Sequence, residues 1–181
     1  MFVVLASLQL SAQDQKYHGD GIDTYLEYTP WLAVCTMKAL QVESASSWKR
    51  LLANSALSYV AAAGTVQLLK TAVREHRPDG TDNRSFPSGH AAISFAGANV
   101  LHHEYGKLSP WISVGGFAVA AFVSVDRVVR NRHHWYDVAA GAAIGYLATE
   151  FGYRLGDLIT GERSRYDISV SPEGLSMVMR F

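Results

Sequence analysis

After residue 25, five long apolar stretches of the chain contain no charged residue, and they constrain the fold more than any other feature of the sequence. Each is 10 to 19 residues long, rich in Ala, Leu, Gly, Val and Ser, and lacks strict alternation of apolar and polar residues. Such segments form helices rather than strands. The sequence therefore predicts an all-α fold, an up-and-down bundle of five to six helices. The segments are Tyr28–Met37, Leu51–Leu69, Ala91–Leu101, Leu108–Val125 and Val138–Thr149.

The same segments leave two environments open for the bundle. Leu51–Leu69 and Leu108–Val125 reach the length of about 18 uncharged residues that is typical of a membrane span, whereas the other three suit buried core helices. Charged residues make up only 18% of the chain, below the roughly 25% usual for soluble domains. The bundle is either soluble or transmembrane, and the abundance of small residues favours the membrane.

Charge balance and cysteine content exclude several classes of protein. The chain has 16 basic and 16 acidic residues, whereas nucleic-acid binders need an excess of Lys and Arg against the phosphates. We therefore expect no nucleic-acid partner. The single cysteine, Cys35, rules out an intramolecular disulfide framework and a Cys-based zinc site.

The two ends of the chain differ from the apolar middle. Residues 1–12 are apolar and end in small residues, like the end of a secretory signal peptide whose basic start is missing, so we expect a truncated signal peptide. A polar lead-in at 13–25 and a helical domain at 26–160 follow. The tail at 161–181 has strand-like runs around Pro172-Glu173-Gly174, which predicts a short β-hairpin.

Polar residues interrupt the apolar pattern in three groups. In an up-and-down bundle with short connections, the second helix ends at the first group and the third begins at the second group. The third group joins the fourth and fifth helices. All three are therefore predicted to lie at one end of the bundle and to form one site. The groups are Lys70 with Arg74 and Arg77-Pro78, then Pro87-Ser88-Gly89-His90, then Arg127–Arg132 with His133, His134 and Asp137.

Part of this site is suited to binding an anion. Lys70, Arg77 and Arg127 supply cationic donors, and the guanidinium forks match a tetrahedral oxyanion. Ser88 and Gly89 stand at a predicted helix start, where backbone N–H groups and the helix dipole favour the same anion.

The other part is suited to proton transfer and nucleophilic attack. His90 and His133 can serve as general acid and nucleophile, because imidazole titrates near neutral pH. Asp137 lies one helical turn after His133, where a carboxylate can hold one ring nitrogen and leave the other free. A metal site built from His90, His133, Asp137 and Asp126 is disfavoured, since nearby Arg and Lys repel a cation. Phosphoryl transfer without a metal or other cofactor is the predicted chemistry.

The spacing Lys70-x6-Arg77-Pro78, Pro87-Ser88-Gly89-His90 and Arg127-x5-His133-x3-Asp137 resembles the three-part signature of the type 2 phosphatidic acid phosphatase (PAP2) superfamily. That superfamily includes lipid phosphate phosphatases, bacterial class A acid phosphatases and vanadium haloperoxidases. The resemblance implies a helical bundle over roughly residues 26–157.

The resemblance also implies individual roles. His133 would form a phosphohistidine, Asp137 would orient it, and His90 would protonate the leaving group and then activate water. The phosphoryl oxygens would be held by Lys70, Arg77, Ser88, Gly89 and Arg127. One position departs from the pattern, because Asp126 stands where the family usually has Ser before the third-group Arg.

Four functions remain open at this point. The first is a membrane-associated phosphatase of a lipid phosphate such as lipid A, phosphatidylglycerol phosphate, undecaprenyl pyrophosphate or phosphatidic acid. The others are a soluble periplasmic acid phosphatase of small phosphomonoesters, a vanadium haloperoxidase, and a non-catalytic binder of phosphate headgroups. The expected location is the cell envelope: either the inner membrane with a periplasm-facing site, or the periplasm. Basic residues at the opposite end of the bundle, among them Lys38, Lys49, Arg50 and Lys107, favour the first arrangement.

Overall fold

The computed structural model describes residues 21–162, 166–171 and 174–179. The expected signal peptide at 1–12 and most of the lead-in lie outside these residues. The described part contains six helices, which confirms the predicted all-α bundle. They are α2 (Asp23–Leu26), α3 (Thr29–Ala39), α4 (Trp48–Val73), α5 (Gly89–Tyr105), α6 (Pro110–Val129) and α7 (Trp135–Thr160).

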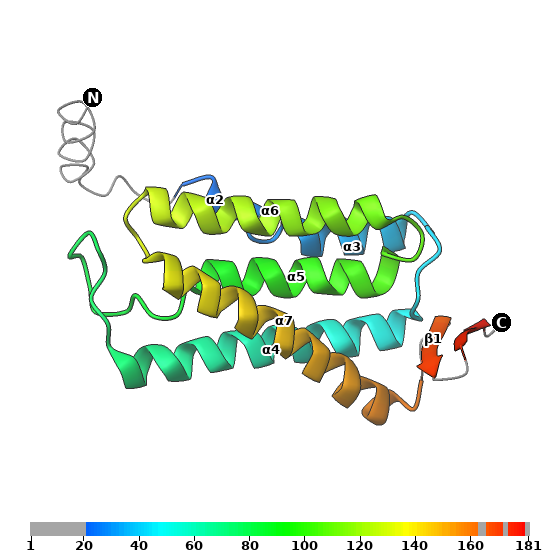
Figure 1. Cartoon of the computed structure of the whole chain (residues 1–181). Coiled ribbons are helices and arrows are strands. Elements are labelled where there is room, and N and C mark those ends of the chain that lie inside the picture. The colour runs from blue at the N-terminus through cyan, green and yellow to red at the C-terminus, as the bar shows by residue number, and fades with distance from the viewer. Residues whose placement is uncertain (1–20, 163–165, 172–173, 180–181) are drawn as a thin grey trace.

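Helix α5 forms the centre of the bundle (Figure 1). It packs against α3, α4, α6 and α7, and 12 of its 17 residues are buried. Half of those buried residues are Ala, Gly or Ser, whose small side chains let the neighbouring helices approach closely. Burial all round explains why its sequence shows no amphipathic stripe.

Helix α7 crosses α5 and α4 at points of close contact marked by glycines. A Cβ atom at Gly141 would lie 2.4 Å from the Ser88 carbonyl oxygen, and one at Gly145 would lie 2.2 Å from the Ala92 carbonyl oxygen. The backbones can approach this closely only because these positions have no side chain. The start of α7 is thereby fixed beside the start of α5.

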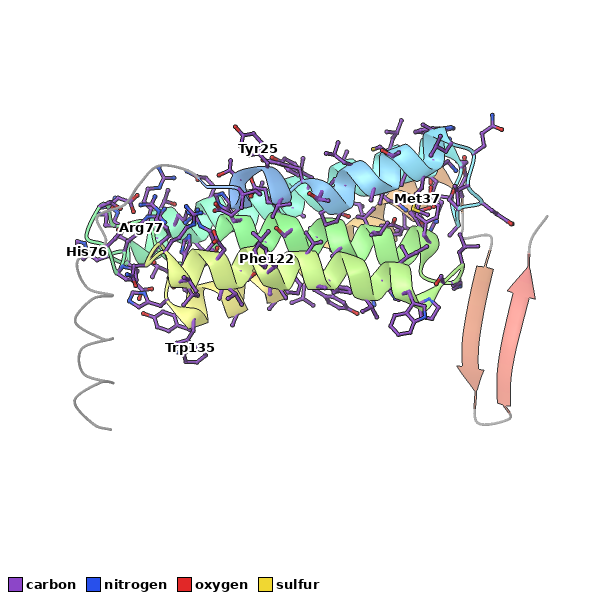
Figure 2. The ribbon with its side chains drawn as sticks, turned by 90° about the horizontal axis from the view of Figure 1, so that it is seen from above. Tyr25, Met37, His76, Arg77, Phe122 and Trp135 are labelled. Atoms are coloured by element: carbon purple, nitrogen blue, oxygen red, sulfur yellow. The ribbon has the colours of Figure 1, made fainter. Side chains whose placement is uncertain are left out.

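The predicted convergence of the three polar groups is confirmed by the fold. Figure 1 places the connection between α4 and α5 at the same end of the bundle as the start of α7. In Figure 2, Arg77 and Trp135 lie near that end and Met37 lies near the other.

The opposite end of the bundle is held by buried polar contacts. Arg50, only 3% exposed, forms a two-pronged ion pair with Asp157, with Nε–Oδ1 at 2.8 Å and Nη2–Oδ2 at 2.9 Å. The Tyr153 hydroxyl donates a hydrogen bond to Glu104 Oε1 at 2.7 Å. These contacts join α4, α5 and α7 far from the predicted site.

Beyond α7 the chain forms the two strands β1 (Tyr166–Ser171) and β2 (Gly174–Met179). They pair antiparallel, with Tyr166 opposite Met179 and Ser171 opposite Gly174. This is the hairpin predicted around Pro172-Glu173-Gly174, and Figure 1 shows it at the end of the bundle opposite the α4–α5 connection.

Candidate active site

His133 lies in the short connection between α6 and α7, and its side chain is 2% exposed. Its Nδ1 atom is 3.5 Å from Asp137 Oδ2, and its Nε2 atom is 3.3 Å from Arg77 Nη1. Guanidinium nitrogens can only donate, so the contact with Arg77 requires Nε2 to be the acceptor and leaves the ring proton on Nδ1, facing Asp137. The imidazole thus points a lone pair toward the cationic group.

The surroundings of His133 keep it neutral. Burial and then the positive charges of Arg77, Lys70, Arg127 and His90 lower the pKa of His133 to about 2. A neutral imidazole is the form that can attack phosphorus.

Asp137 is fixed in place from three directions. Its Oδ2 atom accepts a hydrogen bond from the Ser85 hydroxyl at 2.5 Å and from the His134 backbone N–H at 2.8 Å. Its own carbonyl accepts from the Ser88 N–H at 3.0 Å. Because Asp137 is fully buried, these bonds leave it little freedom, which suits a residue that orients His133.

Arg77 is held by the loops on both sides of the site. Its Nε donates to Asp82 Oδ1 at 2.8 Å, and its Nη1 donates to the Arg132 carbonyl at 2.9 Å. Lys70, in the last turn of α4, donates from Nζ to the Arg84 carbonyl at 2.5 Å. Lys70 therefore lies beside the loop before α5, and Arg77 lies within it. Backbone carbonyl groups accept hydrogen bonds from both side chains and orient them.

The N-terminus of α5 supplies Ser88, Gly89 and His90. Ser88 is the N-cap, and its hydroxyl accepts from the Ala91 N–H at 3.4 Å. Gly89 and His90 form the first turn, so the positive end of the α5 dipole faces the site. A Cβ at Gly89 would meet only Val66 Cγ1 at an ordinary 3.7 Å, so the glycine is not required by local packing.

Arg127 and His90 meet two carboxylates that the sequence analysis did not assign to the site. Arg127 is 3% exposed, and its Nη1 donates to Asp23 Oδ2 in a short contact. His90 Nε2 lies 3.9 Å from Asp23 Oδ2 and 3.9 Å from Glu27 Oε2. Asp23 belongs to the segment predicted to be a polar lead-in. The four-residue spacing of Asp23 and Glu27, one helical turn, was the available signal.

Asp126, which stands where the resemblance leads us to expect Ser, pairs with the residue that caps the C-terminus of its own helix. Its Oδ2 lies 2.8 Å from Arg130 Nε. The carboxylate is therefore neutralised by Arg130.

Within the described residues, one set of side chains has the spacing of a metal site. Ligand atoms of Glu75, His134 and Asp137 lie within 4.8 Å of one another. This is not the set considered from sequence. Asp137 already accepts two hydrogen bonds, and it lies within electrostatic reach of Lys70. These contacts disfavour a cation there.

Comparisons with known proteins identify the family of this chain. The family model of the PAP2 superfamily matches residues 51–158, which include every residue of the three polar groups. The chain belongs to the PAP2 superfamily. A lipid A 1-phosphatase of Porphyromonas gingivalis is 40% identical over 151 residues, and lipid phosphate phosphatase 1 of Arabidopsis thaliana is 40% identical over 83 residues.

The coverage of these PAP2 relatives is uneven. The Porphyromonas alignment covers 83% of this chain and 34% of that protein, and the Arabidopsis alignment covers 40% and 25%. The chain therefore spans about a third or less of the curated relatives it matches. The crystal structure of Aquifex aeolicus LpxE shares the fold, with a TM-score of 0.59 at 23% identity, covering 83% of this chain and 94% of that one.

Proposed function

We propose that this PAP2 protein is a metal-independent phosphatase that hydrolyses a lipid phosphate through a phosphohistidine on His133. The observation that carries the proposal is the position of the His133 ring. Its proton faces Asp137 and its lone pair faces Arg77. A buried, neutral imidazole with one nitrogen held by a carboxylate and the other aimed at cations is arranged to attack a bound anion.

In the first step, the Nε2 lone pair of His133 forms a bond to phosphorus and the ester P–O bond breaks. His90 donates a proton to the departing oxygen, and Asp137 stabilises the positive charge that develops on His133. In the second step, His90 takes a proton from water and the hydroxide attacks phosphorus. The P–N bond breaks, and phosphate and neutral His133 are released.

Lys70, Arg77, Ser88, Gly89 and Arg127 form the proposed phosphate cradle. Arg77 borders the site from the α4–α5 connection and Lys70 from the last turn of α4, and the N-terminus of α5 adds backbone donors. Negative charge on the equatorial oxygens grows in the transition state, so fixed cations stabilise the transition state more than the ground state.

A lipid substrate is supported by the surface of the bundle. Helices α4 and α6 are long and apolar enough to cross a membrane. Their outer faces expose large apolar side chains, and Trp111 and Trp135, at opposite ends of the bundle, are 78% and 72% exposed. Exposed aromatic residues at both ends match the two interfaces of a bilayer.

An apolar groove between α4 and α7 adds to this support. It has a volume of about 520 Å³ and is lined by side chains that include Val60, Leu68, Leu147 and Phe151. Its α4 wall ends two residues before Lys70. An acyl chain lying in this groove would hold its phosphate near the cradle.

We further propose that the site faces the periplasm. Of the basic residues counted at the opposite end, Arg50 is buried against Asp157 and contributes no free charge. Lys49, in the first turn of α4, and Arg154, near the end of α7, remain exposed there, and basic residues close to the ends of a span favour the cytoplasmic side. A cysteine at exposed Asn83 and one at exposed Leu108, each in a Cys35→Ala background, test the orientation in intact cells. A membrane-impermeant thiol reagent should label position 83 alone; labelling at 108 alone would invert the orientation.

Phosphate release by the purified protein tests the function. The panel should include lipid A, phosphatidic acid, phosphatidylglycerol phosphate, undecaprenyl pyrophosphate and nitrophenyl phosphate, with His133→Ala as the inactive control. We expect release from a lipid phosphate that EDTA leaves unchanged and vanadate inhibits. Lipid A is the first substrate to test, because the name of the Porphyromonas relative points to it. No release from any lipid would refute the lipid assignment, and release only from nitrophenyl phosphate would favour the acid phosphatase.

A further inference from the structure

Asp23 is a buried carboxylate in a very short helix. Its side chain has no exposed surface, and its partner Arg127 lies 104 residues further along the chain. Helix α2 contacts both α5 and α6, the two helices that carry His90 and Arg127. A charge is buried in this way only when it is paired.

One oxygen of Asp23 serves both of these residues. Its Oδ2 accepts the hydrogen bond from Arg127 Nη1 and lies 3.9 Å from His90 Nε2. Glu27, one turn later, brings its Oε2 to 3.9 Å from the same nitrogen of His90. Two carboxylates at this distance favour the charged imidazolium.

Arg127 keeps a donor for a ligand. Its Nε atom is buried and has no hydrogen-bond partner in the described part of the chain. Asp23 therefore fixes one side of the guanidinium fork and leaves another side unused. This arrangement orients the Arg127 guanidinium but leaves its Nε–H donor without a hydrogen bond.

The start of α2 is held against the end of α6. A Cβ atom at Gly21 would lie 2.3 Å from Arg130 Cζ, so the guanidinium of Arg130 rests on the backbone at Gly21. Asp126 holds that guanidinium at 2.8 Å. Asp126, which replaces the family's Ser, thus helps to hold Arg130 against the backbone just before α2.

We propose that Asp23 is a positioning residue of the phosphatase reaction, which holds Arg127 for the phosphoryl group and, with Glu27, keeps His90 protonated for the leaving group. This inference rests on the function proposed above. Burial raises the pKa of Asp23, but the hydrogen bond and charge of Arg127 and the charges of His90 and Arg130 outweigh it, so the pKa is lowered and the residue is anionic. Among the described residues, Arg127, His90 and Arg130 are charged groups that act on Asp23. His90 faces Asp23 and Glu27 and lies within electrostatic reach of His133.

The test is the pH dependence of kcat/KM for Asp23→Asn with an alkyl phosphate. Asparagine can still accept a hydrogen bond from Arg127 but carries no charge. His90 in this variant therefore loses its proton at a lower pH than in wild type. We expect the alkaline limb to move to lower pH by about one unit. At pH 8 the rate should fall about tenfold with the alkyl phosphate and much less with nitrophenyl phosphate, whose leaving group needs no acid.

Two further variants separate this role from loss of structure. Asp157→Asn also removes a carboxylate from an arginine pair, but at the opposite end of the bundle, and should leave the pH profile unmoved. Glu27→Gln should shift the alkaline limb in the same direction as Asp23→Asn, and it decides the matter if Asp23→Asn does not fold. An unmoved limb in the folded variants, with active wild type, would overturn the inference. Inactive wild type would instead refute the proposed function.

Discussion

Nε2 of His133 lies 3.3 Å from Nη1 of Arg77, and this contact determines which nitrogen of His133 carries the ring proton. A guanidinium cannot accept, so the imidazole must present its lone pair on that side. In the proposed mechanism the phosphoryl group binds beside this pair, where His133 Nε2 can attack phosphorus and Arg77 can donate to a phosphoryl oxygen.

Replacing His133 should remove turnover. His133→Ala deletes the proposed nucleophile, and the loss should reach several orders of magnitude in kcat, since the residues act as a set. The matched control is His134→Gln, the adjacent histidine, which is 35% exposed and stacks on Tyr136. The control should stay within about tenfold of wild type. Equal losses in both variants would contradict the assignment of the nucleophile.

Replacing His90 should have an effect that depends on the leaving group. His90→Ala lacks the proposed acid, so hydrolysis of an alkyl phosphate should fall by about 10²–10⁴-fold. Nitrophenolate leaves without a proton, so phosphorylation of His133 by nitrophenyl phosphate should persist in single-turnover experiments. If both substrates lose the same factor, His90 is not the acid.

The helices were predictable from sequence, but their ends were not. Charge-free segments identify the part of each helix that packs on apolar neighbours. Helix α7, for example, continues past the charge-free segment Val138–Thr149 to Thr160, with Glu150 paired with His103 and Asp157 paired with Arg50. A charge that finds a buried partner does not end a helix, and the sequence alone does not reveal the partner.

The convergence of the three polar groups was also predictable, since antiparallel helices with short connections bring alternate ends together. The contribution of Asp23 was not. Asp23 stands in the mostly polar segment 13–25, and its partner Arg127 is reached only through the tertiary fold. A segment with the composition of a tether therefore supplies a buried residue of the site.

Acid should destabilise the protein partly through His133. Its pKa is about 2 in the folded chain, against the ordinary histidine value of 6.5 that applies once the chain is unfolded. Below pH 6.5 the unfolded chain binds a proton that the folded chain does not, so stability is lost as the pH falls. Thermal unfolding between pH 7 and pH 4.5 should show a steeper fall for wild type than for His133→Gln. Parallel curves would show that His133 is not buried in its neutral form.

The contact between α7 and α5 should not tolerate a methyl group. A Cβ at Gly145 would lie 2.2 Å from a backbone oxygen, so Gly145→Ala should lower the free energy of unfolding by about 1–3 kcal/mol. Gly64, in the exposed part of α4, has no atom within 4 Å of its Cβ position. Gly64→Ala should be neutral or stabilising by up to about 1 kcal/mol. Equal thermal midpoints for the two variants would contradict the close packing of α7.

Direct detection of the phosphohistidine tests the central claim. Wild type and His90→Ala are mixed with nitrophenyl phosphate, quenched at alkaline pH, which preserves phosphoramidates, and digested for mass spectrometry. The account predicts a phosphoryl group on the peptide carrying His133, more abundant in His90→Ala because its hydrolysis step lacks a base, and none in His133→Ala. Phosphorylation at another residue, or phosphate release from His133→Ala at the wild-type rate, would contradict it.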